Sequence, residues 1–121
     1  MAEKERHQAL VKILRDMDYI AVACTKNEVG KNSARLGAFW KRMGTMKGFS
    51  DLMVFKLKTR EIVFVEMKNW EDGVQKESVD RTKQKPEQEY FEFFITNTMG
   101  MKYFLIDSYK AQNELIEYLK G

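Results

Sequence analysis

The chain has 121 residues, of which 44% are hydrophobic and 12% aromatic, and 21 Lys and Arg stand against 18 Asp and Glu. These values predict a single globular domain over residues 1–121, and the absence of a membrane-length apolar run or an apolar leader predicts a soluble, cytoplasmic protein. Cys24 and His7 are the only cysteine and histidine, which excludes an intrachain disulfide, a cysteine-built zinc site and histidine-based triads.

The N-terminal third begins with a helix over 3–17, in which Glu3 and Glu5 suit the positive end of the helix dipole. Its apolar stripe has helical spacing and consists of Ala9, Leu10, Ile13, Leu14 and Met17. Residues 19–24 are β-branched, aromatic and apolar, which predicts a strand.

A basic segment follows, with a short helix expected around 33–43 that Leu36, Phe39 and Trp40 would hold. Glu28 is its only acid, and its cations are Lys26, Lys31, Arg35, Lys41, Arg42 and Lys47. This charge favours an anionic partner, although an ordinary solvated loop face explains it equally well.

Residues 50–57 and 61–68 read as two strands joined by a tight turn, which predicts an antiparallel hairpin. We expect Leu57 to lie opposite Ile62. In that register Asp51 falls opposite Lys68 at the far end of the hairpin.

Charged side chains stand at that end of the second strand, after the apolar residues Val63, Phe64 and Val65. Glu66 and Lys68 are two residues apart, so both should lie on the face of Phe64. Charges at the end of an apolar strand must be paired, solvated or used.

The remaining chain alternates between helix and strand. Residues 69–85 form a long polar connection, Pro86 begins a helix that Gly100 ends, and 101–107 is a strand. Ser108 should cap the last helix. The expected buried positions are Tyr90, Phe91, Phe94, Ile95 and Met99 in the first helix and Leu115, Ile116 and Leu119 in the second. This order predicts an α/β fold with a mixed sheet covered by helices on both faces.

Two carboxylates and one ammonium at a strand end suit a site for a hard divalent cation. Asp51 and Glu66 offer oxygen ligands, and Lys68 offers an ammonium that can position a water or stabilise phosphate charge. The alternative is an ordinary ion pair between Lys68 and one of the two acids.

The stretches "GFSDLMVF" and "VFVEMK" together resemble the split motif of the PD-(D/E)xK nuclease superfamily. They are most similar to the virus-type replication-repair nuclease domain, with its Gly-x-x-Asp, its Glu-x-Lys strand and a Pro-Glu-Gln helix that ends at glycine. The matching residues are Gly48, Asp51, Glu66, Lys68, Pro86, Glu87, Gln88 and Gly100. The resemblance covers nearly the whole chain in order, although Ser50 replaces the usual proline and Lys85 the frequent Ser or Thr.

The resemblance implies a restriction-endonuclease-like core with a mixed central sheet and a metal-dependent active site. Asp51, Glu66 and the carbonyl of Met67 would bind Mg²⁺ or Mn²⁺. Lys68 would orient or activate the attacking water, and Gln88 would hold that water or Lys68.

Further residues receive expected roles from the resemblance. Glu5 is the candidate for an N-terminal carboxylate that acts on the metal through water, with Glu3 as its rival and a plain helix-start acid as the alternative for both. Segment 26–47 would grip backbone phosphates. Trp40 and Trp70 could stack on bases or, alternatively, belong to the core.

The resemblance therefore implies a structure-selective DNA endonuclease that resolves Holliday junctions. Stand-alone members of the family are phage-type proteins that work as homodimers, and Phe93 or Tyr90 could meet the partner subunit. Two alternatives stay open: a non-catalytic nucleic-acid-binding or assembly module, and a nicking or restriction-like nuclease without junction preference.

Overall fold

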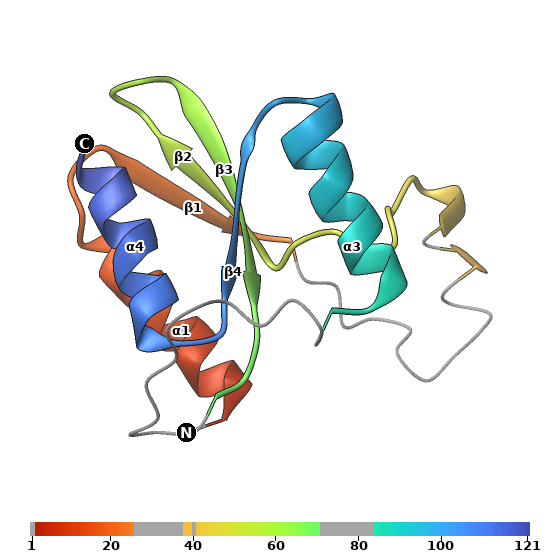
Figure 1. Ribbon diagram of the computed structural model, residues 1–121, viewed down its shortest axis with the longest axis horizontal. Helices are drawn as coiled ribbons and strands as arrows, with labels where there is room; N and C mark the ends of the chain where they lie inside the picture. The colour runs from red at the N-terminus through yellow and green to blue at the C-terminus, as the bar shows by residue number, and fades with distance from the viewer. Residues whose placement is uncertain (1, 26–37, 40, 71–83) are drawn as a thin grey trace.

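The computed structural model describes residues 2–25, 38–39, 41–70 and 84–121 (Figure 1). In chain order the elements are α1 (Glu3–Arg15), β1 (Ile20–Cys24), β2 (Leu52–Lys56), β3 (Glu61–Met67), α3 (Pro86–Phe93), η2 (Phe94–Thr98), β4 (Lys102–Ile106) and α4 (Tyr109–Lys120). The π-helical turn η2 continues α3 directly. Among the residues described, no helix combines the length and apolar character that crossing a membrane requires.

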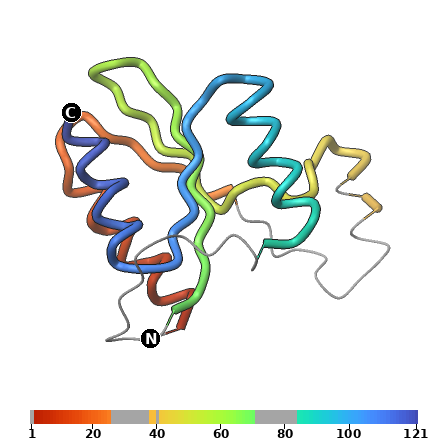
Figure 2. Tube along the Cα trace, in the orientation of Figure 1, coloured from red at the N-terminus to blue at the C-terminus, as the bar shows by residue number. Residues whose placement is uncertain are grey.

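The four strands form one mixed sheet in the order β1-β2-β3-β4. The first three are antiparallel neighbours, whereas β4 runs parallel to β3. A parallel pair needs a crossover, and α3 with η2 lies in the connection between β3 and β4 (Figures 1 and 2). The predicted α/β class and mixed sheet are confirmed.

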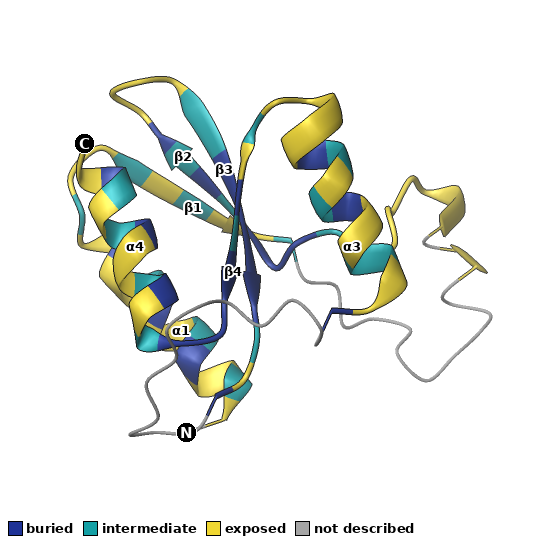
Figure 3. Ribbon diagram, in the orientation of Figure 1, coloured by how far each residue is buried: buried dark blue, intermediate teal, exposed yellow. Residues whose placement is uncertain are grey.

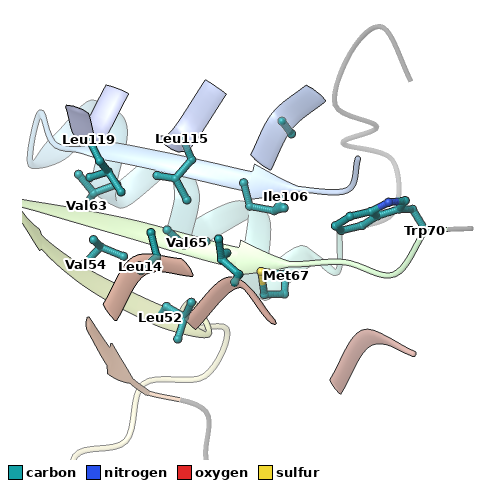
Figure 4. Packing of buried hydrophobic residues seen from close by; sticks show 12 residues of the cluster. Leu14, Leu52, Val54, Val63, Val65, Met67, Trp70, Ile106, Leu115 and Leu119 are labelled. Atoms are coloured by element: carbon teal, nitrogen blue, oxygen red, sulfur yellow. The ribbon is translucent and has the colours of Figure 1, made fainter. Parts of the chain in front are cut away.

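Alternation along β3 divides the core between the two faces of the sheet. Val63, Val65 and Met67 point to the face that α1 and α4 cover (Figure 4). Phe64 points to the opposite face, where it packs with Phe91, Ile95, Tyr103 and Leu105 beneath α3 and η2. Burial concentrates in β2, β3 and β4 and on the inner sides of these helices (Figure 3).

The α1 helix buries a narrower stripe than predicted. Leu10 and Leu14 are fully buried, but Ala9 and Ile13 are exposed, which corrects the prediction for these two positions. The buried line continues instead to Arg6, four residues before Leu10. Positions four apart lie one above another on a helix, so these side chains form the most deeply buried line, and Val11 and Met17 pack beside it.

The helix after Pro86 buries Phe91 and Ile95 as predicted, whereas Tyr90 and Met99 are exposed. Tyr90 lies about 100° around the helix from Phe91, too far to reach the sheet. Met99 directly follows the π-helical turn, and its N–H donates to the Phe94 carbonyl five residues earlier. The wider turn rotates the Met99 side chain away from the buried line. Gly100, with φ of 66°, ends the helix as predicted.

The α4 helix begins as expected, because the Ser108 hydroxyl accepts the N–H of Ala111 at 3.1 Å. Leu115 and Leu119 are buried, while Ile116 is half-buried.

The hairpin register differs from the prediction by two residues. Phe55, and not Leu57, pairs with Ile62, because the connection occupies four residues, 57–60. Arg60 closes it in a left-handed conformation with φ of 60°. A shift of two residues keeps every side chain on its predicted face, and only the cross-strand partners change.

Only part of the predicted short helix around 33–43 can be compared, since 38–39 and 41–42 are helical and the rest lies outside the described residues. Most of the polar connection 69–85 also lies outside them.

Candidate active site

Asp51 and Glu66 lie side by side at one end of the hairpin and are 7% and 3% exposed. The backbone N–H of Asp51 donates to Glu66 Oε1 at 3.2 Å, and the N–H of Met67 donates to Asp51 Oδ2 at 2.8 Å. The expected pairing of Asp51 with Lys68 is therefore corrected: the two-residue shift brings Asp51 level with Glu66.

Lys68 shares the face of Glu66, as the two-residue period predicts. Its backbone N–H donates to the Ile106 carbonyl at 2.9 Å, so the strand geometry of β3 persists through this residue. Its Nζ lies 4.0 Å from Glu66 Oε2 and donates to Gln88 Oε1 at 2.7 Å.

Gln88 joins the first turn of α3 to both charged residues of the β3 end. Its Nε2 donates to Glu66 Oε2 at 2.7 Å, while its Oε1 accepts from Lys68. The same oxygen accepts the backbone N–H of Lys85 at 3.1 Å, which caps the helix where Lys85 has no accepting side-chain atom. These contacts fix the orientation of the amide, since two donors meet its oxygen and one acceptor meets its nitrogen.

Burial dominates the electrostatics of the site. Burial and then the negative charge of Asp51 raise the pKa of Glu66, the Lys68 ammonium opposes both effects, and the net result is a pKa of about 8. A second positive charge close to these carboxylates would relieve the cost of holding them together.

The donor set fits a hard divalent cation. No cluster of three or more His, Cys, Asp and Glu residues occurs in the described ranges, so Asp51 and Glu66 are a pair. Mg²⁺ is commonly held by one or two carboxylates together with waters and substrate phosphate oxygens. The Met67 carbonyl points to the same side of β3 as its N–H, which already contacts Asp51.

The two carboxylates lie at the base of an open cleft of about 710 Å³. Residues 44–49 line one side and the first turn of α3 lines the other. The two sides touch at Gly48, whose φ is 83° and where a Cβ would lie 2.3 Å from the Glu87 carbonyl oxygen. Glycine is therefore required at this position by conformation and by space.

The predicted phosphate-binding cations divide into two groups. Lys41, Arg42 and Lys47 are exposed, and Lys47 lines the cleft. The other three, Lys26, Lys31 and Arg35, lie outside the described residues.

The remaining predicted residues lie away from the cleft or outside the described ranges. Glu5 is exposed on α1, which covers the opposite face of the sheet, and neither Glu5 nor the half-buried Glu3 is among the described residues of the cleft lining. Trp70 is buried against α1, with the Arg6 guanidinium 3.9 Å from its ring centre, which favours the core alternative over base stacking. Trp40 lies outside the described residues.

Thr25 is a residue of the cleft that the sequence pattern did not single out. Its N–H donates to the Asp51 carbonyl at 2.8 Å, and its hydroxyl donates to the carbonyl of the buried Ser50. The available signal was its place directly after the strand 19–24, because an antiparallel neighbour of β2 must end beside Asp51.

Chemically, the network offers two acidic oxygen ligands and an oriented amide that line one cleft, with the Lys68 ammonium hydrogen-bonded to that amide. Such a set can hold a cation and position a water next to an anionic substrate. No protein-family model, no curated protein and no solved structure matches the chain.

Proposed function

We propose that the chain is a metal-dependent endonuclease that hydrolyses phosphodiester bonds in DNA. The observation that carries this proposal is a hydrogen-bonded network in which Asp51, Glu66 and Gln88 line the cleft and Lys68 donates to Gln88. The mixed sheet flanked by helices is compatible with a PD-(D/E)xK core.

Asp51, Glu66 and the Met67 carbonyl are the groups that would hold Mg²⁺ or Mn²⁺. When bound there, the cation would offset the charge of the two carboxylates and would supply Lewis-acid polarisation of the phosphodiester. The chain itself keeps both carboxylates in place through backbone donors on the neighbouring strand.

Lys68 positions the attacking water, and Gln88 positions Lys68. The ammonium can donate three hydrogen bonds, of which Gln88 accepts one. The oxygen of the water bonds to phosphorus and loses one proton to solvent, the bond from phosphorus to the 3′ oxygen breaks, and that oxygen takes up a proton from solvent. The products are a 5′-phosphate and a 3′-hydroxyl.

A catalytic role explains the network better than a purely structural ion pair does. A purely structural ion pair needs only Lys68 and Glu66. The nearby Asp51 would weaken such a pair, because its negative charge raises the pKa of Glu66 and opposes the ionisation of Glu66. Like-charged carboxylates that the fold holds together despite their mutual repulsion are typical of functional sites.

The finer part of the proposal is a homodimer that resolves four-way junctions. Asp51 and Glu66 form one candidate site in each chain, so two symmetric cuts require two chains. Tyr90 and Phe93 are exposed on α3 and offer apolar surface for a partner subunit.

The test is incubation of the protein with a four-way junction, a fork and a linear duplex, with Mg²⁺, Mn²⁺ or a chelator. We expect metal-dependent cleavage by the wild type and none by Asp51→Asn. Binding without cleavage under every metal condition would instead support a non-catalytic module.

A further inference from the structure

Residues 38–49, which we call the rim segment, carry unusual exposed apolar surface beside the cleft. In its described part, Phe39, Met43 and Met46 are 42%, 66% and 48% exposed. The N–H of Met43 donates to the Phe39 carbonyl at 3.1 Å, so these two residues lie one helical turn apart on the same side. Exposed apolar side chains gathered in this way mark an interaction surface.

The positive charge of the rim segment favours binding to an anionic partner. Lys41, Arg42 and Lys47 are exposed, and the sequence places no Asp or Glu between 38 and 49. Cations interleaved with apolar side chains fit a nucleic acid whose bases are accessible, because phosphates meet the cations and unstacked bases meet the apolar groups.

Continuity with the cleft favours DNA over an anionic membrane or an acidic protein. Met46 and Lys47 line the same cleft as Asp51 and Glu66. A strand bound in this cleft therefore lies next to the rim segment, whereas a flat membrane surface cannot reach carboxylates that are almost fully buried.

The rim segment is anchored at its C-terminal end, so the position of this end relative to the carboxylates is fixed. The Phe49 ring packs 4.5 Å from the Phe91 ring and 5.9 Å from the Phe64 ring, in the core beneath α3. Next to it, Gly48 lies against the Glu87 backbone. The segment stands beside α3 in Figures 1 and 2.

We propose that the rim segment is an apolar wedge that binds DNA where a duplex opens into single strands. This inference rests on the proposed nuclease function and specifies the substrate of the same site. Apolar side chains enter between base steps by unstacking them, and this requires least energy where base pairing is already interrupted. Branched or splayed DNA is therefore the preferred substrate, and continuous duplex is bound mainly through its phosphates.

The test uses Met43→Gln combined with Met46→Gln, which keeps side-chain length while removing the apolar character. Met99→Gln is the matched control, since Met99 is also exposed but follows η2 outside the cleft lining. Binding is measured in a chelator, with a splayed-arm DNA that carries 2-aminopurine at its last base pair and a duplex of equal length.

We expect the wild type to raise 2-aminopurine fluorescence and to prefer the splayed DNA by about tenfold, the effect of one stacked base. The double variant should lose the fluorescence change and most of the preference, with duplex affinity kept within about twofold. The control should behave as the wild type.

Two results would overturn the wedge while leaving the nuclease proposal in place, provided that the wild type still cuts DNA with Mg²⁺ or Mn²⁺. One is an unchanged preference in the double variant, and the other is an equal loss of affinity for splayed and duplex DNA. A wild type that neither binds nor cuts any DNA would overturn both proposals, as would binding to anionic lipid vesicles in its place.

Discussion

The backbone N–H of Asp51 donates a hydrogen bond to the Glu66 carboxylate, which ties two acidic residues on neighbouring strands to one another at 3.2 Å. Asp51 in turn accepts the N–H of Met67. Each carboxylate is thus held by a backbone donor of the other's strand. Because these donors do not depend on side-chain charge, the charge can be removed while the geometry stays.

Asp51→Asn should abolish metal-dependent cleavage, with a loss of at least about 100-fold, while the fold and DNA binding persist. The amide oxygen of Asn can still accept the Met67 N–H, so only the ligand charge is removed. Cleavage assays with Mg²⁺ and Mn²⁺ measure the loss, and circular dichroism with DNA-binding titrations provides the control. Cleavage at the wild-type rate would contradict the site assignment.

Glu66→Gln should also abolish cleavage, and it should stabilise the metal-free protein at high pH. The pKa of Glu66 is raised from 4.5 to about 8, so the folded protein binds one proton more than the unfolded chain between these values. The free energy of unfolding therefore falls as the pH rises from about 4.5 to 8, and the variant lacks this loss.

Thermal unfolding in a chelator between pH 5 and 9 measures this effect. The Tm of Glu66→Gln should exceed that of the wild type by roughly 5 °C above pH 8, and the difference should shrink toward pH 5. A difference that does not vary with pH would show that Glu66 is ionised throughout this range.

Lys68→Ala should reduce the cleavage rate by roughly 100-fold, as loss of a group that acts in the transition state commonly does. Metal affinity should change little, because Lys68 is not a proposed ligand.

Lys68→Met is the packing control, since it keeps the apolar stem of the side chain. Methylamine added to Lys68→Ala should restore part of the rate, which loss of a structural ion pair would not allow. A variant that loses thermal stability and keeps its rate would favour the ion pair.

Gly48→Ala should destabilise the protein more than Gly44→Ala does, by about 2 kcal/mol. Both glycines have positive φ, 83° and 97°, so the backbone strain is common to the two variants. A Cβ at Gly48 would collide with the Glu87 backbone, whereas a Cβ at Gly44 has no atom within 4 Å. Urea unfolding of the two variants isolates the contact between the cleft walls, and equal destabilisation would show that this contact contributes nothing.

The parts of the site that follow from local periodicity could be predicted from the sequence. The two-residue repeat of a strand places Glu66 and Lys68 on one face, and the structure has them there. The partner of Asp51 could not be predicted in the same way, because the length of the 57–60 connection sets the register.

Burial that depends on distant contacts was not predictable from the helical pattern. Arg6 is buried although it is charged, since its guanidinium lies over the Trp70 ring and donates to the Trp70 carbonyl at 2.7 Å. Ile13 fits the apolar stripe and is nevertheless exposed, because the fully buried side of the helix is centred on Leu10 and Leu14. The spacing of residues along α1 does not show where Trp70 or the sheet lies relative to the helix.

The active species should be a homodimer that dissociates when the outer face of α3 is made polar. Tyr90 and Phe93 are 72% and 56% exposed, and at a spacing of three residues they lie on one side of the helix. The terminal helix does not cover this face within one chain, because α4 packs on the opposite face of the sheet. Light scattering at micromolar concentration should give twice the mass of one chain for the wild type and for Met99→Gln.

Tyr90→Lys combined with Phe93→Ser should give a monomer that still cuts single phosphodiester bonds. This monomer should make no paired cuts in a plasmid cruciform, because one pair of carboxylates serves one strand. A wild type that is monomeric at these concentrations would contradict the dimer and leave the cleavage chemistry untouched.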